Sequence, residues 1–303
     1  MNANVAISYL ESTARQRIER LFDAGSFVEF LPPSSRVVSP HLGQLDAPVA
    51  FDDGVAVGRA TLDGIEVLVA AQEGGFMGGA VGEVHGAKLV GLLRRAAIEG
   101  KPVLLLLESG GVRLHEANAG LIAVSEVMRA VFDARAAGVP VITLAGGSNG
   151  VFGGMGIVAR CTTAVIMSEE ARLAMSGPEV IETAAGVEEF DARDRALVWR
   201  TTGGKHRYLL GDCQQLVADS VAAFRAAAIA TLAACAGASS ALDLAELEAE
   251  QAMLTKRIEH FGGAADPLEI WMALGAPEPA RLPLLDAADF VAAVAAHRVG
   301  GRP

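Results

Sequence analysis

The feature that most constrains the fold is one order of elements that recurs along the first half of the chain. A short apolar run is followed by a glycine-rich loop and then by a helical pattern. The runs lie at 67–71, 103–107 and 139–144, and the helices are expected near 82–98, 119–137 and 151–159. The second and third runs do not alternate between apolar and polar residues, which is typical of strands covered on both faces. The sequence therefore predicts an α/β domain with a largely parallel sheet.

The segments around this pattern complete the expected organisation. Residues 8–24 carry an apolar face at helical spacing and end at Gly25, which predicts an N-terminal amphipathic helix. Asp63-Gly64 lies between two β-rich runs within 54–71, a hairpin signal, whereas the proline-rich segment 30–53 is expected to be extended. A further strand is expected at 164–167 and a short run at 172–175, and Pro178 is expected to open a helix.

The last part of the chain is predicted to be helical, at about 213–236, 240–261, 267–274 and 286–298. This gives three expected parts. They are an N-terminal helix and arm (1–30), a core (31–212) and a helical C-terminal extension (213–303).

Composition excludes several classes of protein. With 25 basic and 36 acidic residues the net charge is −11, which disfavours nucleic acid and anionic membranes as partners. The three cysteines form no C-x-x-C pair, so a four-thiolate zinc site is excluded and a disulfide framework is not expected. No segment is long and apolar enough to span a bilayer, and charged residues interrupt any signal-peptide core near the N-terminus. A soluble, cytoplasmic protein is expected.

The glycine loops are the candidate sites of chemistry. A glycine loop between a strand and a helix directs backbone N–H groups and a positive helix end at one point, which suits either a phosphate or an oxyanion. The loops at 74–79, 109–113 and 146–154 contain neither a P-loop nor a clean G-x-G-x-x-G motif.

Ser109 is not in a nucleophile elbow, His115-Glu116 lacks a second metal-ligating histidine, and no metal site is evident. His85, His115 and His206 are candidate bases. The remaining interpretation is catalysis by backbone donors at an acyl oxygen, at about 2.7–4 kcal/mol per well-placed donor.

Several segments resemble acyl-CoA carboxyltransferase subunits. They are 14–29, the GGAVGEVHGAK segment at 78–88 and the ESGGVRLHE segment at 108–116, in the order and spacing of that family. Segments 108–118 and 146–156 resemble, within the family, the β subunits of biotin-independent malonate decarboxylases. The four-cysteine zinc ribbon of bacterial acetyl-CoA carboxylase β subunits is absent from this sequence. The resemblance implies a crotonase-type ββα superhelix with an N-terminal helix and a helical C-terminal extension.

The resemblance also implies an activity. With a homologous γ subunit, such a β subunit decarboxylates a malonyl thioester on an acyl carrier subunit, giving an acetyl thioester and carbon dioxide. The carrier's arm is a phosphoribosyl-dephospho-coenzyme A group, a transferase subunit exchanges acetyl for malonyl, and this chain itself is expected to bind no cofactor or metal. The expected backbone donors to the enolate are Gly110, Gly111, Gly150, Gly153 and Gly154. Expected substrate contacts are Ser109, Arg113, His115, Gly78 and Gly79, with Arg113 binding a carboxylate or fixing the loop by a salt bridge.

Three alternatives remain open from the sequence. A carboxyltransferase subunit that moves a carboxyl group between biotin and an acyl-CoA would have the same fold and the same donors. A non-catalytic scaffold would use the glycine loops only for packing beside a catalytic partner. Binding of a nucleotide by the loops is the third alternative.

Overall fold

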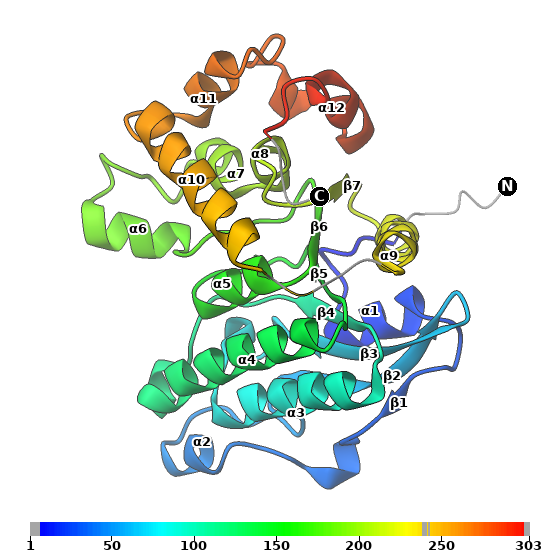
Figure 1. Cartoon of the computed structure of the whole chain (residues 1–303). Helices are drawn as coiled ribbons and strands as arrows, with labels where there is room; N and C mark the ends of the chain where they lie inside the picture. The colour runs from blue at the N-terminus through cyan, green and yellow to red at the C-terminus, as the bar shows by residue number, and fades with distance from the viewer. Residues whose placement is uncertain (1–6, 238–240, 242, 300–303) are drawn as a thin grey trace, which may run out of the picture.

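The fold is built on one seven-stranded sheet, seen in a computed structural model that describes residues 7–237, 241 and 243–299 (Figure 1). The strands lie side by side in chain order, from β1 to β7. The pairs β1–β2 and β2–β3 are antiparallel, and every later pair is parallel, as the apolar runs predict. The strands are β1 (Val28–Glu29), β2 (Val55–Leu62), β3 (Ile65–Gln72), β4 (Val103–Leu107), β5 (Val141–Ala145), β6 (Ala164–Ser168) and β7 (Gln215–Val217).

The predicted hairpin is confirmed at β2 and β3. Leu62 pairs with Ile65, so the turn consists of Asp63 and Gly64 alone. Both residues have positive φ, 52° and 76°, as the favoured two-residue hairpin turn requires.

Helices cover both faces of the sheet. On one face lie α1 (Ala14–Leu21) and α9 (Val221–Cys235), and on the other α3 (Glu83–Glu99), α4 (Asn118–Ala136) and α5 (Gly154–Cys161) (Figure 1). The strand β4 shows why its sequence is apolar throughout. Leu104 and Leu106 pack with α1 and α9, whereas the alternate residues pack with α3 and α4, and all of them are buried.

Beyond the carboxyl ends of the strands, the loops pair with one another. Val81 bridges Val112, Ser109 bridges Val151, and Val151 bridges Leu173, all in parallel. Each strand is therefore followed by a second short pairing before its helix, which is the ββα repeat expected from the sequence. The third predicted helix begins at Gly154 rather than near 151, because Val151 is used in these bridges.

Other expected boundaries differ for local reasons. The N-terminal helix begins at Ala14, because Thr13 and Gln16 form a capping box. The segment 30–53 is not wholly extended: it contains a 3-10 turn (Pro33–Ser35) and the short helix α2 (Pro40–Gln44), each with a proline in its first turn. Pro178 does open a helix, α6 (Pro178–Ala185).

The C-terminal third differs most from the prediction. The segment expected to be helical from about 213 starts with β7, which pairs with β6 and completes the sheet. A three-residue strand with a polar first residue has no pattern of its own, so only its partner strand identifies it. The remaining helices are α7 (Arg195–Thr202), α8 (Gly204–Leu209), α10 (Leu244–Phe261), α11 (Pro267–Ala273) and α12 (Ala287–Val294).

Candidate active site

The glycine loops after β3, β4 and β5 form one continuous surface at the carboxyl edge of the sheet. The Gly110 N–H donates to the Gly78 carbonyl at 2.8 Å. Ser109 donates to the Gly150 carbonyl at 2.8 Å and accepts from the Phe152 N–H at 2.7 Å. The three loops are thus connected by backbone hydrogen bonds.

Two of the loops touch at a pair of glycines. A Cβ atom on Gly153 would lie 2.9 Å from the Cα of Gly111, and both residues have positive φ, 59° and 141°. Gly79 is under a similar constraint, since a Cβ there would lie 1.9 Å from the Glu108 carbonyl oxygen. Glycine is required at these positions so that neighbouring backbones can approach.

The five predicted donors differ in whether their backbone N–H groups already donate to a carbonyl of the fold. Those of Gly110, Gly150 and Gly153 donate to the carbonyls of Gly78, Gly147 and Met175, at 2.8, 3.0 and 2.9 Å, so these three expected donors are already used within the fold. Across the described ranges, the Gly154 N–H, at the first position of α5, donates no backbone hydrogen bond. The Gly111 N–H donates to the Ser109 hydroxyl at 3.3 Å, and no backbone carbonyl of the described residues accepts from it.

The two remaining donors are accessible. Gly111 and Gly154 are both half-buried, and a Cβ on Gly111 would meet nothing within 4 Å. A negatively charged oxygen that accepts from the Gly154 N–H would also face the N-terminus of α5, where the helix dipole is positive.

Ser109 and Arg113 are engaged within the loop. The Ser109 hydroxyl contacts both the carbonyl and the N–H of Gly111, at 3.2 and 3.3 Å. All three nitrogens of the Arg113 guanidinium have partners: Nη1 pairs with the Asp53 carboxylate at 2.7 Å, and Nη2 and Nε donate to the carbonyls of Asp53 and Ala80. Arg113 therefore fixes the loop by a buried salt bridge.

His115 differs from these residues because its side chain is exposed. It lies in a 3-10 turn (Leu114–Glu116) directly before α4. Next to it, Leu114 is 88% exposed.

Glu108, which the sequence reasoning did not single out, is the centre of the loop cluster. Its carboxylate is buried and accepts hydrogen bonds from Arg17 at 2.6 Å, from the Ser148 hydroxyl at 3.2 Å and from the Asn149 N–H at 3.1 Å. A signal for it existed, because a charged residue directly follows the continuously apolar strand β4. Arg17 gave a second signal, since it lies one turn from Leu21 on the buried face of α1.

Beneath the loops, His85 is locked as a neutral imidazole. Its Nδ1 lies 3.0 Å from the Asp53 carbonyl and therefore carries the proton, so Nε2 accepts from Gln72 at 3.0 Å. Burial lowers the pKa of His85 to about 3. This histidine is a structural residue, since both of its ring nitrogens are occupied.

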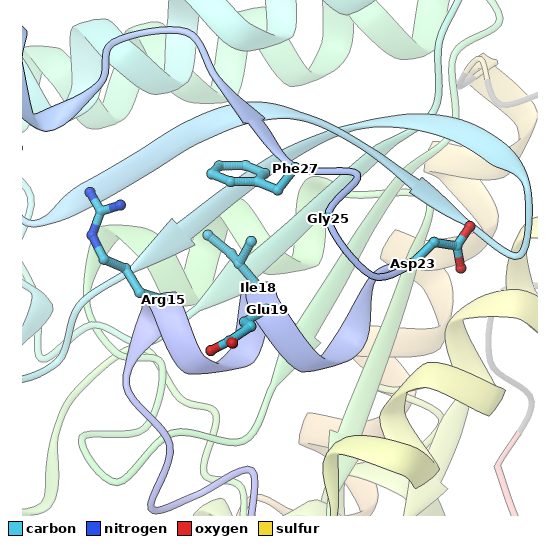
Figure 2. A pocket seen from close by; sticks show the side chains of 6 residues that line it. All are labelled: Arg15, Ile18, Glu19, Asp23, Gly25 and Phe27. Carbon is cyan, nitrogen blue, oxygen red and sulfur yellow. The ribbon is translucent and has the colours of Figure 1, made fainter.

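A separate hollow of about 230 Å³ lies between α1 and the arm that leads to β1 (Figure 2). Figure 2 shows Phe27 and Ile18 facing one another across it, with Arg15 and Asp23 at opposite ends. Hydrogen bonds from the Gly64 N–H and from Arg225 hold the pKa of Asp23 well below its usual value. None of the glycine-loop residues lines this hollow, so it lies outside the candidate active site.

The described ranges contain neither a cluster of metal ligands nor a membrane-spanning helix. No group of three or more His, Cys, Asp or Glu side chains there is arranged to hold a metal ion. None of the helices in those ranges combines the length and the apolarity needed to cross a bilayer.

Comparison with known proteins gives the family. The model of the carboxyl transferase domain matches residues 11–216, which include the whole sheet up to β7 and all three glycine loops. The chain belongs to the carboxyl transferase domain family. Helices α9 to α12 follow the matched part of this carboxyl transferase domain.

Two relatives by sequence are named for malonyl-S-ACP and for propionyl-CoA. The chain is 46% identical over 240 residues to malonyl-S-ACP:biotin-protein carboxyltransferase MADC of Malonomonas rubra, which covers 74% of this chain and 75% of that protein. It is 34% identical over 204 residues to the propionyl-CoA carboxylase beta chain of Saccharopolyspora erythraea, covering 66% of this chain and 36% of that one.

Solved structures agree with this assignment. A Pseudomonas malonate decarboxylase hetero-tetramer in complex with malonate contains a chain that is 44% identical, with a TM-score of 0.73, over 76% of this chain and 84% of that one. The transcarboxylase 12S core matches with a TM-score of 0.62 at 27% identity, over 73% of this chain and 41% of that one. The predicted crotonase-type fold is confirmed, and a role of the malonate decarboxylase type is supported.

Proposed function

We propose that this chain is the β subunit of a malonate decarboxylase, which decarboxylates malonyl-S-acyl carrier protein together with a γ subunit. The observation that carries the proposal is a pair of N–H groups, those of Gly111 and Gly154, that no backbone carbonyl of the described residues accepts, on two loops that touch at Gly111 and Gly153. Relatives whose names specify malonyl-S-ACP or malonate, at 46% and 44% identity, support the choice of substrate.

The proposed reaction needs little beyond these donors. The bond between the malonyl carbon and its carboxylate breaks, carbon dioxide leaves, and the electron pair moves into the thioester to form an enolate. The Gly111 and Gly154 N–H groups stabilise the negative oxygen, by about 2.7–4 kcal/mol for each well-placed donor. A proton from water or from the γ subunit then adds to the enolate carbon and gives the acetyl thioester.

The other predicted site residues take supporting parts in this proposal. Ser109 and Arg113 hold the loop that carries Gly111, and the Gly78 carbonyl fixes Gly110 beside it. His115 is the exposed side chain among the predicted contacts, and we assign it to the carrier-bound substrate.

The proposal also includes partners. Exposed apolar side chains lie on the turn that follows the Gly111 loop and on the first turns of α4: Leu114, Leu121 and Ile122 are 88%, 57% and 62% exposed. Such a patch beside a site is typical of a protein interface. We assign it to the γ subunit, and the hetero-oligomeric Pseudomonas structures support a partner of this kind. The acyl carrier subunit, with its phosphoribosyl-dephospho-coenzyme A arm, and a transferase subunit complete the proposed system, in which the chain itself is proposed to bind no cofactor.

One observation favours a second candidate function. The relative from Malonomonas rubra is by name a biotin-protein carboxyltransferase. The same donors would stabilise the same enolate in that reaction, with biotin as the carboxyl acceptor.

The test uses the chain copurified with its γ subunit. Malonyl thioester on the carrier arm is supplied without biotin, and release of carbon dioxide is followed. Release at a catalytic rate supports the decarboxylase, whereas carboxyl transfer that requires a biotinylated acceptor supports the second function. If neither occurs, the scaffold interpretation gains support.

Two glycine variants make the test specific. Gly111→Ala introduces no clash but disfavours the backbone at φ 141°, so it is expected to displace the donor and reduce the rate at least tenfold. Gly91→Ala is the matched control: it lies in α3, a Cβ there meets nothing within 4 Å, and full activity is expected.

A further inference from the structure

We propose that Glu108 is a positioning residue of this site. Its carboxylate, paired with Arg17, holds the loop after β5 against the loop after β4, so that the Gly111 and Gly154 N–H groups face the same space. The expected effect of Glu108 on the reaction rate rests on the proposed function. Its expected effect on the position of the loops rests on geometry alone.

The two carboxylate oxygens have separate tasks. Oε1 accepts three hydrogen bonds from the loop after β5, namely from the Asn149 N–H at 3.1 Å, the Asn149 amide at 3.0 Å and the Ser148 hydroxyl at 3.2 Å. Oε2 accepts the Arg17 guanidinium at 2.6 Å. The Glu108 backbone N–H donates to Gln72 at the end of β3, at 3.1 Å.

The neighbouring loops are shaped around this side chain. A Cβ on Gly74 or on Gly147 would lie 2.2 Å from the Glu108 carboxylate group. The space beside these two glycines is therefore filled by a protein carboxylate. The loops after β3 and β5 therefore both contact Glu108, which itself begins the loop after β4.

Arg17 is the sole positive partner that contacts this carboxylate among the described residues. Its side chain is buried, its Nε donates to the Tyr9 carbonyl at 3.0 Å, and its guanidinium lies 4.6 Å from the Tyr9 ring. Because both members of the pair are out of water, removal of either charge leaves the other buried and unpaired.

Glu108 and its partner Asn149 lie close in sequence to the two proposed N–H donors. Glu108 is three residues before Gly111, and the loop it anchors at Asn149 leads directly to Gly153 and Gly154. A displacement of about 1 Å in a donor reduces a rate by about a hundredfold. Loss of the anchor is thus expected to affect kcat more than KM.

Glu108→Gln is the first variant. Glutamine has the same shape, but its NH₂ group must face either the Arg17 guanidinium or the Asn149 donors, so one side of the anchor is lost. We expect kcat to fall at least tenfold, with KM changed less than threefold.

Arg17→Met combined with Glu108→Gln is the rescue. The NH₂ group then faces an apolar neighbour and the amide oxygen still accepts from Asn149, so kcat is expected to recover by at least threefold over the single Glu108→Gln variant. Val131→Ala, at a buried position of α4 away from the loops, is the control for lost stability, and its kcat is expected to be unchanged. A wild-type kcat in Glu108→Gln, or a double variant slower than the single one, overturns the proposal.

Amide hydrogen exchange gives a second measurement that does not require activity. The Asn149 amide is expected to exchange at least tenfold faster in Glu108→Gln than in the wild type, and to recover in the double variant. If the wild type proves inactive, the proposed function fails while this exchange result still decides the role of Glu108. Unchanged exchange at Asn149 overturns the positioning role.

Discussion

The attachment of the C-terminal helices to the core is predicted to weaken in mild acid because of one buried histidine. His206 of α8 is 5% exposed, and its Nδ1 accepts the indole N–H of Trp271 of α11 at 2.9 Å. An imidazole that accepts at Nδ1 must be unprotonated there. Burial lowers the pKa of His206 to about 3.

The sign and size of the effect follow from linkage. The unfolded chain binds the proton with a pKa of about 6.5, so stability from His206 is complete above that pH and is lost as the pH falls toward the folded pKa of about 3. Each pH unit in this window costs about 1.4 kcal/mol. At pH 5.0 the loss from this one group is therefore about 2 kcal/mol.

The measurement is the free energy of unfolding in urea at pH 7.5 and pH 5.0. His206→Gln keeps an acceptor for Trp271 but removes the titration, so it is expected to lose about 2 kcal/mol less than the wild type between these pH values. His85 is present in both proteins, so its own contribution cancels. His260→Gln, at an exposed position of α10, serves as the control and is expected to behave like the wild type. An equal loss in the wild type and in His206→Gln would refute the reasoning.

Three further predictions concern the site and the packing around it. Gly153→Ala places a Cβ 2.9 Å from the Gly111 Cα, so unfolding experiments are expected to show a loss of about 1–3 kcal/mol, with carbon dioxide release reduced at least tenfold. Arg113→Met leaves the fully buried Asp53 unpaired and is expected to cost about 3–5 kcal/mol of stability, of which Asp53→Asn in the same chain restores a part. Asp212→Asn removes the carboxylate that three arginines share between the core and α10, so amides at 244–261 are expected to exchange faster, whereas unchanged exchange there contradicts this account.

Burial alone would raise the pKa of Asp212, but the guanidinium groups of Arg160, Arg207 and Arg257 together hold it below its usual value. The Asp212 carboxylate is therefore charged at neutral pH. This charge is what the three arginines recognise, and its neutralisation in the asparagine variant is the reason that α10 is expected to loosen.

Much of the fold was predictable because its signals are local. The apolar runs at 103–107 and 139–144 predicted buried parallel strands, since the residues of a strand that is covered on both faces need not alternate between apolar and polar. Asp63-Gly64 fixed the hairpin through the positive φ angles that its turn requires. The helices at 83–99 and 118–136 followed from their periodicity within one residue.

The candidate site was predictable only as a region. Glycines at the ends of successive strands indicated that backbones come close together there, and the resemblance to carboxyltransferase subunits indicated why. Sequence alone could not tell which glycine N–H groups lack a backbone acceptor, because the acceptors of Gly110 and Gly153 come from other segments of the chain.

The sequence by itself determined the order of strands β2 to β6 with the helices between them, the turn chemistry and the family, because each depends on neighbours along the chain. Only the tertiary structure decided that the Gly111 and Gly154 N–H groups lack a backbone acceptor among the described residues, that Gly74 and Gly147 lie against Glu108, and that β7 completes the sheet. These features depend on pairs of residues far apart in sequence, such as Arg17 and Glu108. A contact of that kind has no local pattern, and it exists only once the sheet has brought the loops to one edge.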